Sequence, residues 1–255
     1  MSKKKKGKKE ERYQGKTFPV PQTLYKMQEN ITITTNTSPN VSKEQIINQA
    51  IKLNSQGKYK EAAKYYQLFI DKGYKDYRVF SNYGSILKSL RKLKEAEIAT
   101  REAIELNPDF AIAHSNLGGI LKDLGKVEEA EVSTRKAIKL NPDYALAHSN
   151  LGSILNDLGK VKEAEVSTRK ALALNPNLAI TYSNLGNILR DLGKTDEALS
   201  CYEKAINIDK NLDSALEGIG RLLLKKGNHM DGILKLREAI GSINFNPKNS
   251  SITIN

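Results

Sequence analysis

The sequence predicts an all-α protein built as a solenoid, which is an array of stacked helix-turn-helix repeats. Residues 114–142 are closely repeated at residues 148–176, with His-Ser-Asn-Leu-Gly at the start of both copies and Asn-Pro at the end of both. Pro142 follows Pro108 by 34 residues, and Pro176 follows Pro142 by 34 residues. A fixed period of this length is typical of arrays in which each two-helix unit packs only on its neighbours.

The period divides the chain into three parts. Residues 1–42 show no helical periodicity and begin with a basic block, so we expect a disordered basic N-terminal arm. Ser42 is a favourable N-cap residue for the first helix. Six repeats follow at residues 43–76, 77–110, 111–144, 145–178, 179–212 and 213–246, and we expect residues 247–255 to form a C-terminal tail.

Glycines and Asn-Pro pairs predict where the helices end within each repeat. A glycine at the end of the first helix supplies the left-handed conformation that closes many helices. These glycines are Gly57, Gly125, Gly159, Gly193 and Gly227. The second repeat has Arg91 at this place, which predicts a small local cost. Asn-Pro at 107–108, 141–142 and 175–176 ends the second helix, because the residue before proline disfavours the helical conformation.

A second glycine series lies within the first helices, where glycine is about 1 kcal/mol less favourable than alanine. Its members are Gly84, Gly118, Gly152, Gly186 and Gly220. We therefore expect the paired helix to approach closely at these points. The small residues expected opposite are Ala96, Ala130, Ala164 and Ala198. The last repeat has Gly232 in place of that alanine and carries Arg221, Lys225 and Lys226, which suits a polar cap for the array.

Composition restricts the class of protein. The single cysteine, Cys201, excludes an internal disulfide framework and suits a reducing compartment. No apolar run approaches the roughly 18 residues of a membrane span, and the basic start lacks the apolar segment of a secretory signal. We expect a cytoplasmic protein. Half of the net charge of +12 falls in residues 1–16, where eight Lys and Arg side chains outnumber two Glu side chains.

The sequence shows no motif of a catalytic, metal or cofactor site. It contains no phosphate-binding glycine loop, no Cys/His metal spacing and no nucleophile elbow. His114 and His148 lie one period apart, but the corresponding residues Phe80 and Tyr182 cannot bind a metal, so we interpret both imidazoles as packing residues. We predict a non-enzymatic protein without cofactor or metal.

The repeats resemble the tetratricopeptide repeat (TPR) family. In the second repeat the signature places of that family hold Phe80, Tyr83, Gly84, Leu87, Ala96, Ala103 and Pro108. The resemblance implies a right-handed solenoid whose first helices line its inner, concave surface. The sequence departs from the signature at Thr100, Thr134 and Thr168, which replace an aromatic residue, and at the two histidines.

One asparagine per repeat is the main candidate for a binding site. Asn48, Asn82, Asn116, Asn150 and Asn184 are 34 residues apart, so stacking aligns them in one row. The resemblance places this row on the concave surface, where amides can donate to and accept from the backbone of an extended peptide. The row is similar to the asparagine ladder of the O-linked N-acetylglucosamine transferase repeats. Alternatively, Ser-Asn-Leu-Gly is a common TPR sequence and the row binds no ligand.

The neighbouring residues on this face are polar and of mixed charge. Those of the predicted peptide site are Lys88, Lys122 and Arg190. The basic residues of the family's carboxylate clamp are missing, which argues against binding of chaperone tails.

We predict a scaffold that binds an extended segment of a protein partner. One alternative is a targeting module for a separate or fused transferase or oxygenase. Another is contact of residues 3–16 with nucleic acid or an anionic surface, which would weaken steeply with salt.

Overall fold

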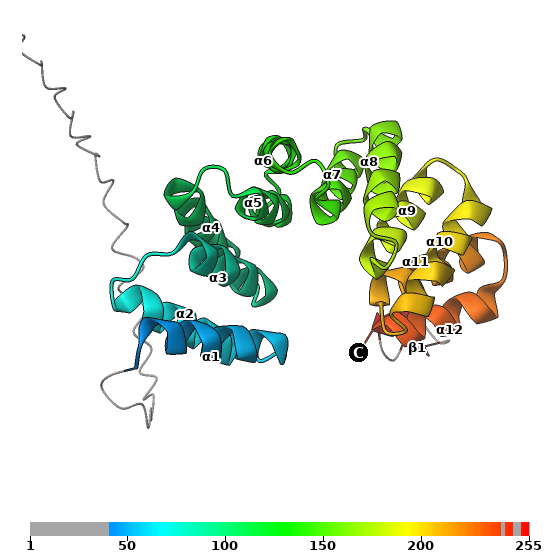
Figure 1. The fold of residues 1–255 in the computed structure, drawn as a ribbon. Helices are drawn as coiled ribbons and strands as arrows, with labels where there is room; N and C mark the ends of the chain where they lie inside the picture. The colour runs from blue at the N-terminus through cyan, green and yellow to red at the C-terminus, as the bar shows by residue number, and fades with distance from the viewer. Residues whose placement is uncertain (1–40, 241–242, 247–250, 255) are drawn as a thin grey trace, which may run out of the picture. The chain divides into compact units, whose positions relative to one another are not determined.

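The computed structural model describes residues 41–240, 243–246 and 251–254. Within these residues twelve helices follow one another as a stacked array (Figure 1). The predicted basic arm, and with it the predicted contact with nucleic acid, lies outside the described residues except for Val41 and Ser42. The helices are α1 (Lys43–Ser55), α2 (Tyr59–Asp71), α3 (Tyr77–Ser89), α4 (Leu93–Leu106), α5 (Ala111–Asp123), α6 (Val127–Leu140), α7 (Ala145–Asp157), α8 (Val161–Leu174), α9 (Ala179–Asp191), α10 (Thr195–Ile208), α11 (Asp213–Lys225) and α12 (His229–Ile240).

The beginning of the array is fixed by a capping box. The backbone N–H of Gln45 donates to Ser42 Oγ at 3.2 Å, and the backbone N–H of Ser42 donates to Gln45 Oε1 at 2.8 Å. Two N–H groups that have no partner within the helix are thereby satisfied. The expected N-cap at Ser42 is confirmed.

The turns inside the repeats require a left-handed residue. Each expected glycine has a positive φ between 71° and 83° at the end of the first helix of its pair. Arg91 occupies the same place in the second repeat with a φ of 60°, and it is the one non-glycine residue with positive φ in the described part of the chain. The local cost predicted there therefore has a defined geometric origin.

The asparagine before proline ends the second helix of the repeats in two ways. Its backbone is disfavoured in the helical conformation, and its side chain accepts a hydrogen bond in the turn that follows. Asn141 has an extended backbone at the end of α6, and its Oδ1 accepts a hydrogen bond from the backbone N–H of Asp143 at 3.2 Å. Asp209 ends α10 in the same way, accepting from the N–H of Asn211 at 3.1 Å. The carboxylate thus preserves the turn in a repeat that lacks Asn-Pro.

Close contact between paired helices explains the glycines inside the first helices. A Cβ added to Gly118 would collide with Thr134 Oγ1 and would lie 3.2 Å from the carbonyl oxygen of Ala130. The Thr134 hydroxyl donates to that carbonyl at 2.8 Å, so it is satisfied although it is buried. Gly84 and Gly152 meet Thr100 and Thr168 in the same way. The threonines that depart from the aromatic signature therefore lie in the space that the missing Cβ of each glycine leaves.

The helices form two layers. Each odd-numbered helix from α3 to α11 packs on its own partner and on the odd-numbered helix of the neighbouring repeat, whereas the described even-numbered helices do not pack extensively on one another. The odd-numbered helices therefore form the inner layer of the array. Apolar clusters join adjacent repeats, as where Leu117, Leu121 and Ala130 pack on Ile154 of the next repeat. The all-α solenoid is confirmed.

Ion pairs join the outer sides of adjacent repeats. In repeat three, Glu131 pairs with Arg135 at 2.9 Å and with Lys160 of the next repeat at 2.8 Å, and Arg135 also reaches Glu163 at 3.3 Å. Glu97 and Glu165 are centres of equivalent pairs. We call these three glutamates and their cations the outer ion-pair network.

Hydrogen bonds within this network alter the acidity of the glutamates. The bond from Lys160, assisted by the bond from Arg135, lowers the pKa of Glu131 against the opposing effect of desolvation. Burial raises the pKa of Glu97 and of Glu165, but the hydrogen bonds from their Arg and Lys partners outweigh it, so both pKa values are lowered. The charged form of all three glutamates is therefore favoured in the folded protein.

The end of the last repeat differs from the sequence assignment. The repeat period places residues 243–246 in the sixth repeat and predicts a tail at residues 247–255. The structure instead ends α12 at Ile240 and pairs β1 (Ile243–Asn246) antiparallel with β2 (Ser251–Ile254), with Ile243 opposite Ile254. Both segments alternate apolar and polar residues, a pattern that favours strands over helix.

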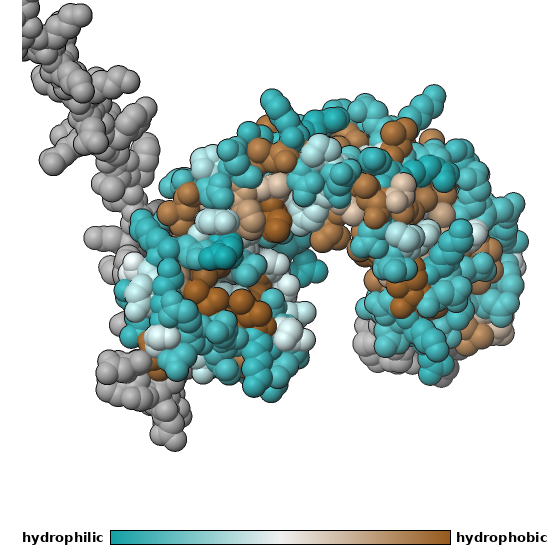
Figure 2. All heavy atoms as spheres, viewed as in Figure 1, coloured by the Kyte–Doolittle hydropathy of each residue, from teal (hydrophilic) through white to brown (hydrophobic). Residues whose placement is uncertain are grey.

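The visible surface of the array is largely hydrophilic, with hydrophobic residues showing in patches between helices (Figure 2). Within the described ranges, no helix has the length and apolar character needed to cross a membrane.

Candidate functional site

The inner layer presents parallel rows of side chains. On α5, Ile112, Asn116, Gly119 and Asp123 follow one another at spacings of three or four residues, so they lie along one face of the helix. Because the odd-numbered helices from α3 to α11 pack side by side, each such position continues as a row across their repeats. We call the series of Asn48, Asn82, Asn116, Asn150 and Asn184 the asparagine row.

Two members of the asparagine row are held by the preceding repeat. The Asn116 Nδ2 donates to Ser81 Oγ at 3.0 Å and lies 3.5 Å from the Ser81 carbonyl oxygen. Asn150 Nδ2 makes the same contacts with Ser115 at 3.1 and 3.4 Å. A carbonyl only accepts, so the amide nitrogen must face the serine. Both amides are thereby oriented, and no described residue donates to their Oδ1 atoms.

Asn184 lacks this contact for a local reason. The hydroxyl of Ser149, which corresponds to Ser81 and Ser115, is hydrogen-bonded to Thr181 Oγ1 at 2.8 Å. The equivalent residue in the two preceding repeats is alanine. As a result, the half-buried Asn184 side chain forms no hydrogen bond within the described residues, and both its donor and its acceptor remain available.

The first two members of the row have different surroundings. Asn48 on α1 is exposed. Asn82 lies beside the buried Tyr66 hydroxyl, whose pKa is raised by desolvation and lowered to a smaller extent by the Asn82 side chain. This contact lacks good hydrogen-bond geometry, because the Tyr66 hydroxyl has no partner at hydrogen-bonding distance and angle within the described residues.

The cations of the predicted peptide site are paired with acids along the inner layer. Lys88 Nζ lies 3.6 Å from the Asp123 carboxylate of the next repeat, and Lys122 lies 3.5 Å from Asp157. One repeat further on, Asn156 Nδ2 donates to Asp191 at 3.1 Å. The predicted mixed charge is therefore arranged as pairs between adjacent repeats.

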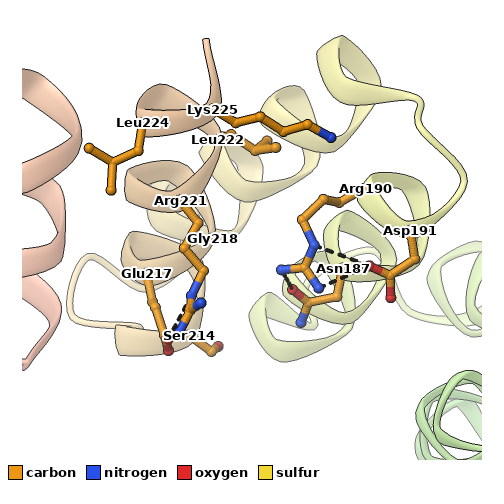
Figure 3. A pocket seen from close by; sticks show the side chains of 10 residues that line it. All are labelled: Asn187, Arg190, Asp191, Ser214, Glu217, Gly218, Arg221, Leu222, Leu224 and Lys225. Carbon is orange, nitrogen blue, oxygen red and sulfur yellow. Dashed lines mark hydrogen bonds and ion pairs between the residues drawn. The ribbon is translucent and has the colours of Figure 1, made fainter. Parts of the chain in front are cut away.

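This pairing stops at Arg190. The residue it would reach in the sixth repeat is Lys225, a like charge, and Arg190 instead pairs with Asp191 at 3.0 Å and donates to Asn187 Oδ1 at 3.2 Å. An open hollow of about 690 Å³ lies here between α9 and α11 (Figure 3). We call it the terminal pocket. Its lining residues are Asn187, Arg190, Asp191, Ser214, Glu217, Gly218, Arg221, Leu222, Leu224 and Lys225.

Two features of this face were not predicted from the sequence. Ile112, Leu146 and Ile180 precede the row asparagines by four residues, lie on the same helix faces and are 42–45 % exposed, so they form an apolar row beside the amides. The terminal pocket was also missed, since Arg221 and Lys225 were interpreted as part of a polar cap. Two signals in the sequence could have revealed these features. Apolar residues recurring at the repeat period indicate the apolar row, and the replacement of aspartate by Lys225 indicates the terminal pocket.

The two histidines contact backbone in their own repeats. His114 Nε2 lies 2.8 Å from the Pro108 carbonyl oxygen, and His148 Nε2 lies 2.9 Å from that of Pro142. Each ring nitrogen therefore donates to the turn before its helix. In the part of the chain that the structure describes, no three His, Cys, Asp or Glu side chains are grouped so that they could hold a metal ion.

Comparison with solved structures shows similar arrays. A thermophilic TPR protein from Thermus thermophilus is 21 % identical, with a TM-score of 0.63, over 72 % of this chain and 100 % of that chain. A chain of the APC/C hetero-tetramer Cut9–Hcn1 is 18 % identical, with a TM-score of 0.72, over 78 % of this chain and 40 % of that chain. MamA is 25 % identical, with a TM-score of 0.50, over 65 % of this chain and 94 % of that chain.

Comparison with protein families places the repeats directly. Three tetratricopeptide repeat models match residues 77–110, 143–211 and 183–247, and a TPR repeat model matches residues 118–159. A search of curated proteins gives no match. Because the four matches together span most of the helical array, and because the array has the paired helices and turns described above, the chain belongs to the tetratricopeptide repeat family.

Proposed function

We propose that the protein is a non-catalytic scaffold whose asparagine row holds an extended segment of a partner protein along the inner layer. The family match supports the general role of a protein-interaction scaffold. The observation that carries the more specific proposal is the orientation of Asn116 and Asn150, whose amide nitrogens face serines while their Oδ1 atoms have no described donor.

The chemistry of the row favours backbone recognition. The Oδ1 atoms left available are acceptors, and the donors that every peptide repeats are its backbone N–H groups. A row of acceptors can bind these N–H groups whatever side chains the peptide carries. The adjacent apolar row of Ile112, Leu146 and Ile180 can bury apolar side chains of the same segment, which supplies the contact area that a few hydrogen bonds lack.

The spacing of the row fits a polyproline II conformation. Packed helices lie roughly 8–10 Å apart, so successive row members on the contacting helices α3, α5, α7 and α9 are separated by about that distance. A polyproline II chain has three residues per turn with a rise of about 3.1 Å each, which gives a turn of about 9 Å. Every third N–H of such a segment can therefore face one amide.

Asn184 gives the cleanest test. We select binders from a random 12-residue peptide library with the intact chain and measure their affinity by fluorescence anisotropy. Asn184→Ala removes no hydrogen bond within the described protein, so it should weaken binding by about 2- to 10-fold, the value of one neutral hydrogen bond. The unfolding midpoint should remain close to that of the unmodified protein.

A matched control separates ligand binding from the alignment of the repeats. Ser115→Ala removes the serine hydroxyl that Asn150 contacts, but the Ser115 carbonyl oxygen at 3.4 Å still orients the Asn150 amide, so the variant should reduce stability more than affinity. The triple variant Asn116→Ala, Asn150→Ala, Asn184→Ala should lose binding almost completely. If the selected peptides bind the triple variant as tightly as the intact chain, or if no peptide is selected, the asparagine row is not a peptide site.

A further inference from the structure

The terminal pocket arises where the sixth repeat departs from the pattern of the others. The place of the row asparagine is taken by Gly218, and the place of Asp123, Asp157 and Asp191 is taken by Lys225. Both changes fall on the same side of α11 and line the same hollow. The end of the asparagine row is thus replaced by an open, basic pocket.

The buried side chain of Tyr202 explains why residue 218 is glycine. A Cβ added to Gly218 would collide with the Tyr202 ring, whose Cδ1 it would approach to 2.9 Å. Tyr202 replaces the threonine of the three preceding repeats, and its hydroxyl donates to Asn187 Oδ1 at 2.8 Å. That oxygen also accepts from Arg190. Tyr202 therefore leaves room only for glycine where the row would have its next asparagine. Through Asn187 it also helps to hold Arg190 at the edge of the pocket.

The charges of the terminal pocket do not balance. Arg190 pairs with Asp191 at 3.0 Å, and Arg221 pairs with Glu217 at 2.6 Å. Lys225 forms no ion pair within the described residues, and its side chain extends from α11 toward the side of the pocket where Arg190 lies (Figure 3). Three cations and two carboxylates leave one positive charge, which a single anionic group would neutralise.

We propose that the terminal pocket is a carboxylate subsite of the scaffold, which binds one acidic group of the segment held by the asparagine row. This inference rests on the proposed function, since the same segment would occupy both. The Lys225 ammonium and the remaining guanidinium N–H groups of Arg190 and Arg221 supply charge-assisted donors, which are stronger than neutral ones. The subsite fixes the position of the segment along the row, because its acidic group must lie at the end of the array formed by α11.

The test uses small probes and the full chain labelled with ¹⁵N. N-acetyl-glutamate N-methylamide supplies a side-chain carboxylate, N-acetyl-alanine supplies a terminal carboxylate, and N-acetyl-glutamine N-methylamide is the neutral analogue of the first. Titration should produce saturable NMR shifts at the amides of Gly218, Arg221 and Lys225 with the carboxylates and not with the amide. The stronger of the two carboxylates identifies whether the subsite takes a side chain or a chain end.

Substitution of Lys225 tests the origin of the site. Lys225→Asp restores the residue that the three preceding repeats carry at this place and gives Arg190 the partner that Lys88 and Lys122 have. Binding of the carboxylate probes should fall by at least about tenfold, the value of a charge-assisted hydrogen bond. Lys225→Gln removes only the charge and should give an intermediate loss.

A control of equal charge change is Lys136→Asp on α6. Lys136 is exposed and forms no ion pair within the described part of the chain, so this variant should bind the probes unchanged. The proposal is overturned if the carboxylates cause no shifts around Gly218, if the glutamine analogue causes equal shifts, or if Lys225→Asp binds as well as the intact chain. The Asn184→Ala measurement is independent of these titrations, so failure of the subsite and failure of the asparagine row are told apart.

Discussion

Replacement of Arg91 by glycine should stabilise the array, because Arg91 is the one non-glycine residue of the described ranges that has a left-handed backbone. It has a φ of 60°, whereas the glycines at the same place in the other five repeats have φ between 71° and 83°. Arg91 is exposed and forms no ion pair among the described residues. The substitution therefore removes a steric penalty without removing a contact.

The magnitude follows from two opposing effects. A non-glycine residue in the left-handed region costs about 1–2 kcal/mol. Glycine loses more conformational freedom on folding, which offsets about 0.5–1 kcal/mol of this gain. The net stabilisation expected for Arg91→Gly is about 0.5–1 kcal/mol, and for an array of this size the melting temperature should rise by about 1–4 °C.

The change in stability is measured by thermal and urea unfolding, with far-UV circular dichroism as the signal. Gly125→Arg, at the same place in the third repeat, should lower stability by a similar amount. Lys94→Gly controls for the flexibility of glycine, since the exposed Lys94 lies inside α4, where glycine is unfavourable, and its replacement should destabilise. If Arg91→Gly is neutral or destabilising while Gly125→Arg is tolerated, the left-handed turn does not limit stability and the reasoning is wrong.

Three further predictions concern packing, hydrogen bonding and charge. Gly118→Ala should destabilise by about 1–3 kcal/mol in urea unfolding, and the loss should shrink in a Thr134→Ala background, because the Thr134 hydroxyl is the atom it would strike. Tyr202→Phe removes the hydrogen bond to Asn187 and should cost about 0.5–1.5 kcal/mol, whereas Tyr66→Phe should be nearly neutral because that hydroxyl has no partner of good geometry within the described residues. The glutamates of the outer ion-pair network have lowered pKa values in the folded state, so their stabilising contribution is complete above the ordinary pKa of 4.5 and is lost as the pH falls below it. Urea midpoints compared at neutral pH and at about pH 3.5 should show this loss, and Glu131→Gln should reduce it; an unchanged midpoint would mean that the network contributes nothing.

The repeat could be predicted from the sequence, but only part of the arrangement of its inner face could. The sequence correctly predicted the helix pairs, the left-handed turns, the Ser42 cap and the close contact at Gly118, because each of these depends on residues within one repeat or on backbone preferences. It also identified the asparagine row, whose role in binding stays a proposal. The pairing of Lys88 with Asp123 and of Asn116 with Ser81 was not predicted. Both pairs are 35 residues apart, one more than the period, so a search at the period alone does not find them.

The sequence by itself determined the unit and the number of times it is repeated, because a 34-residue period of glycine, alanine and Asn-Pro specifies two helices and the turns between them. Only the tertiary structure decided what those units present to a partner. Whether an amide is oriented by its neighbour, as at Asn150, or left available, as at Asn184, depends on which side chains meet across adjacent helices. The terminal pocket depends in the same way on Tyr202, Gly218 and Lys225 coming together from α10 and α11. Such side-chain contacts depend on how adjacent repeats pack on each other. The order of residues within one repeat does not specify this packing.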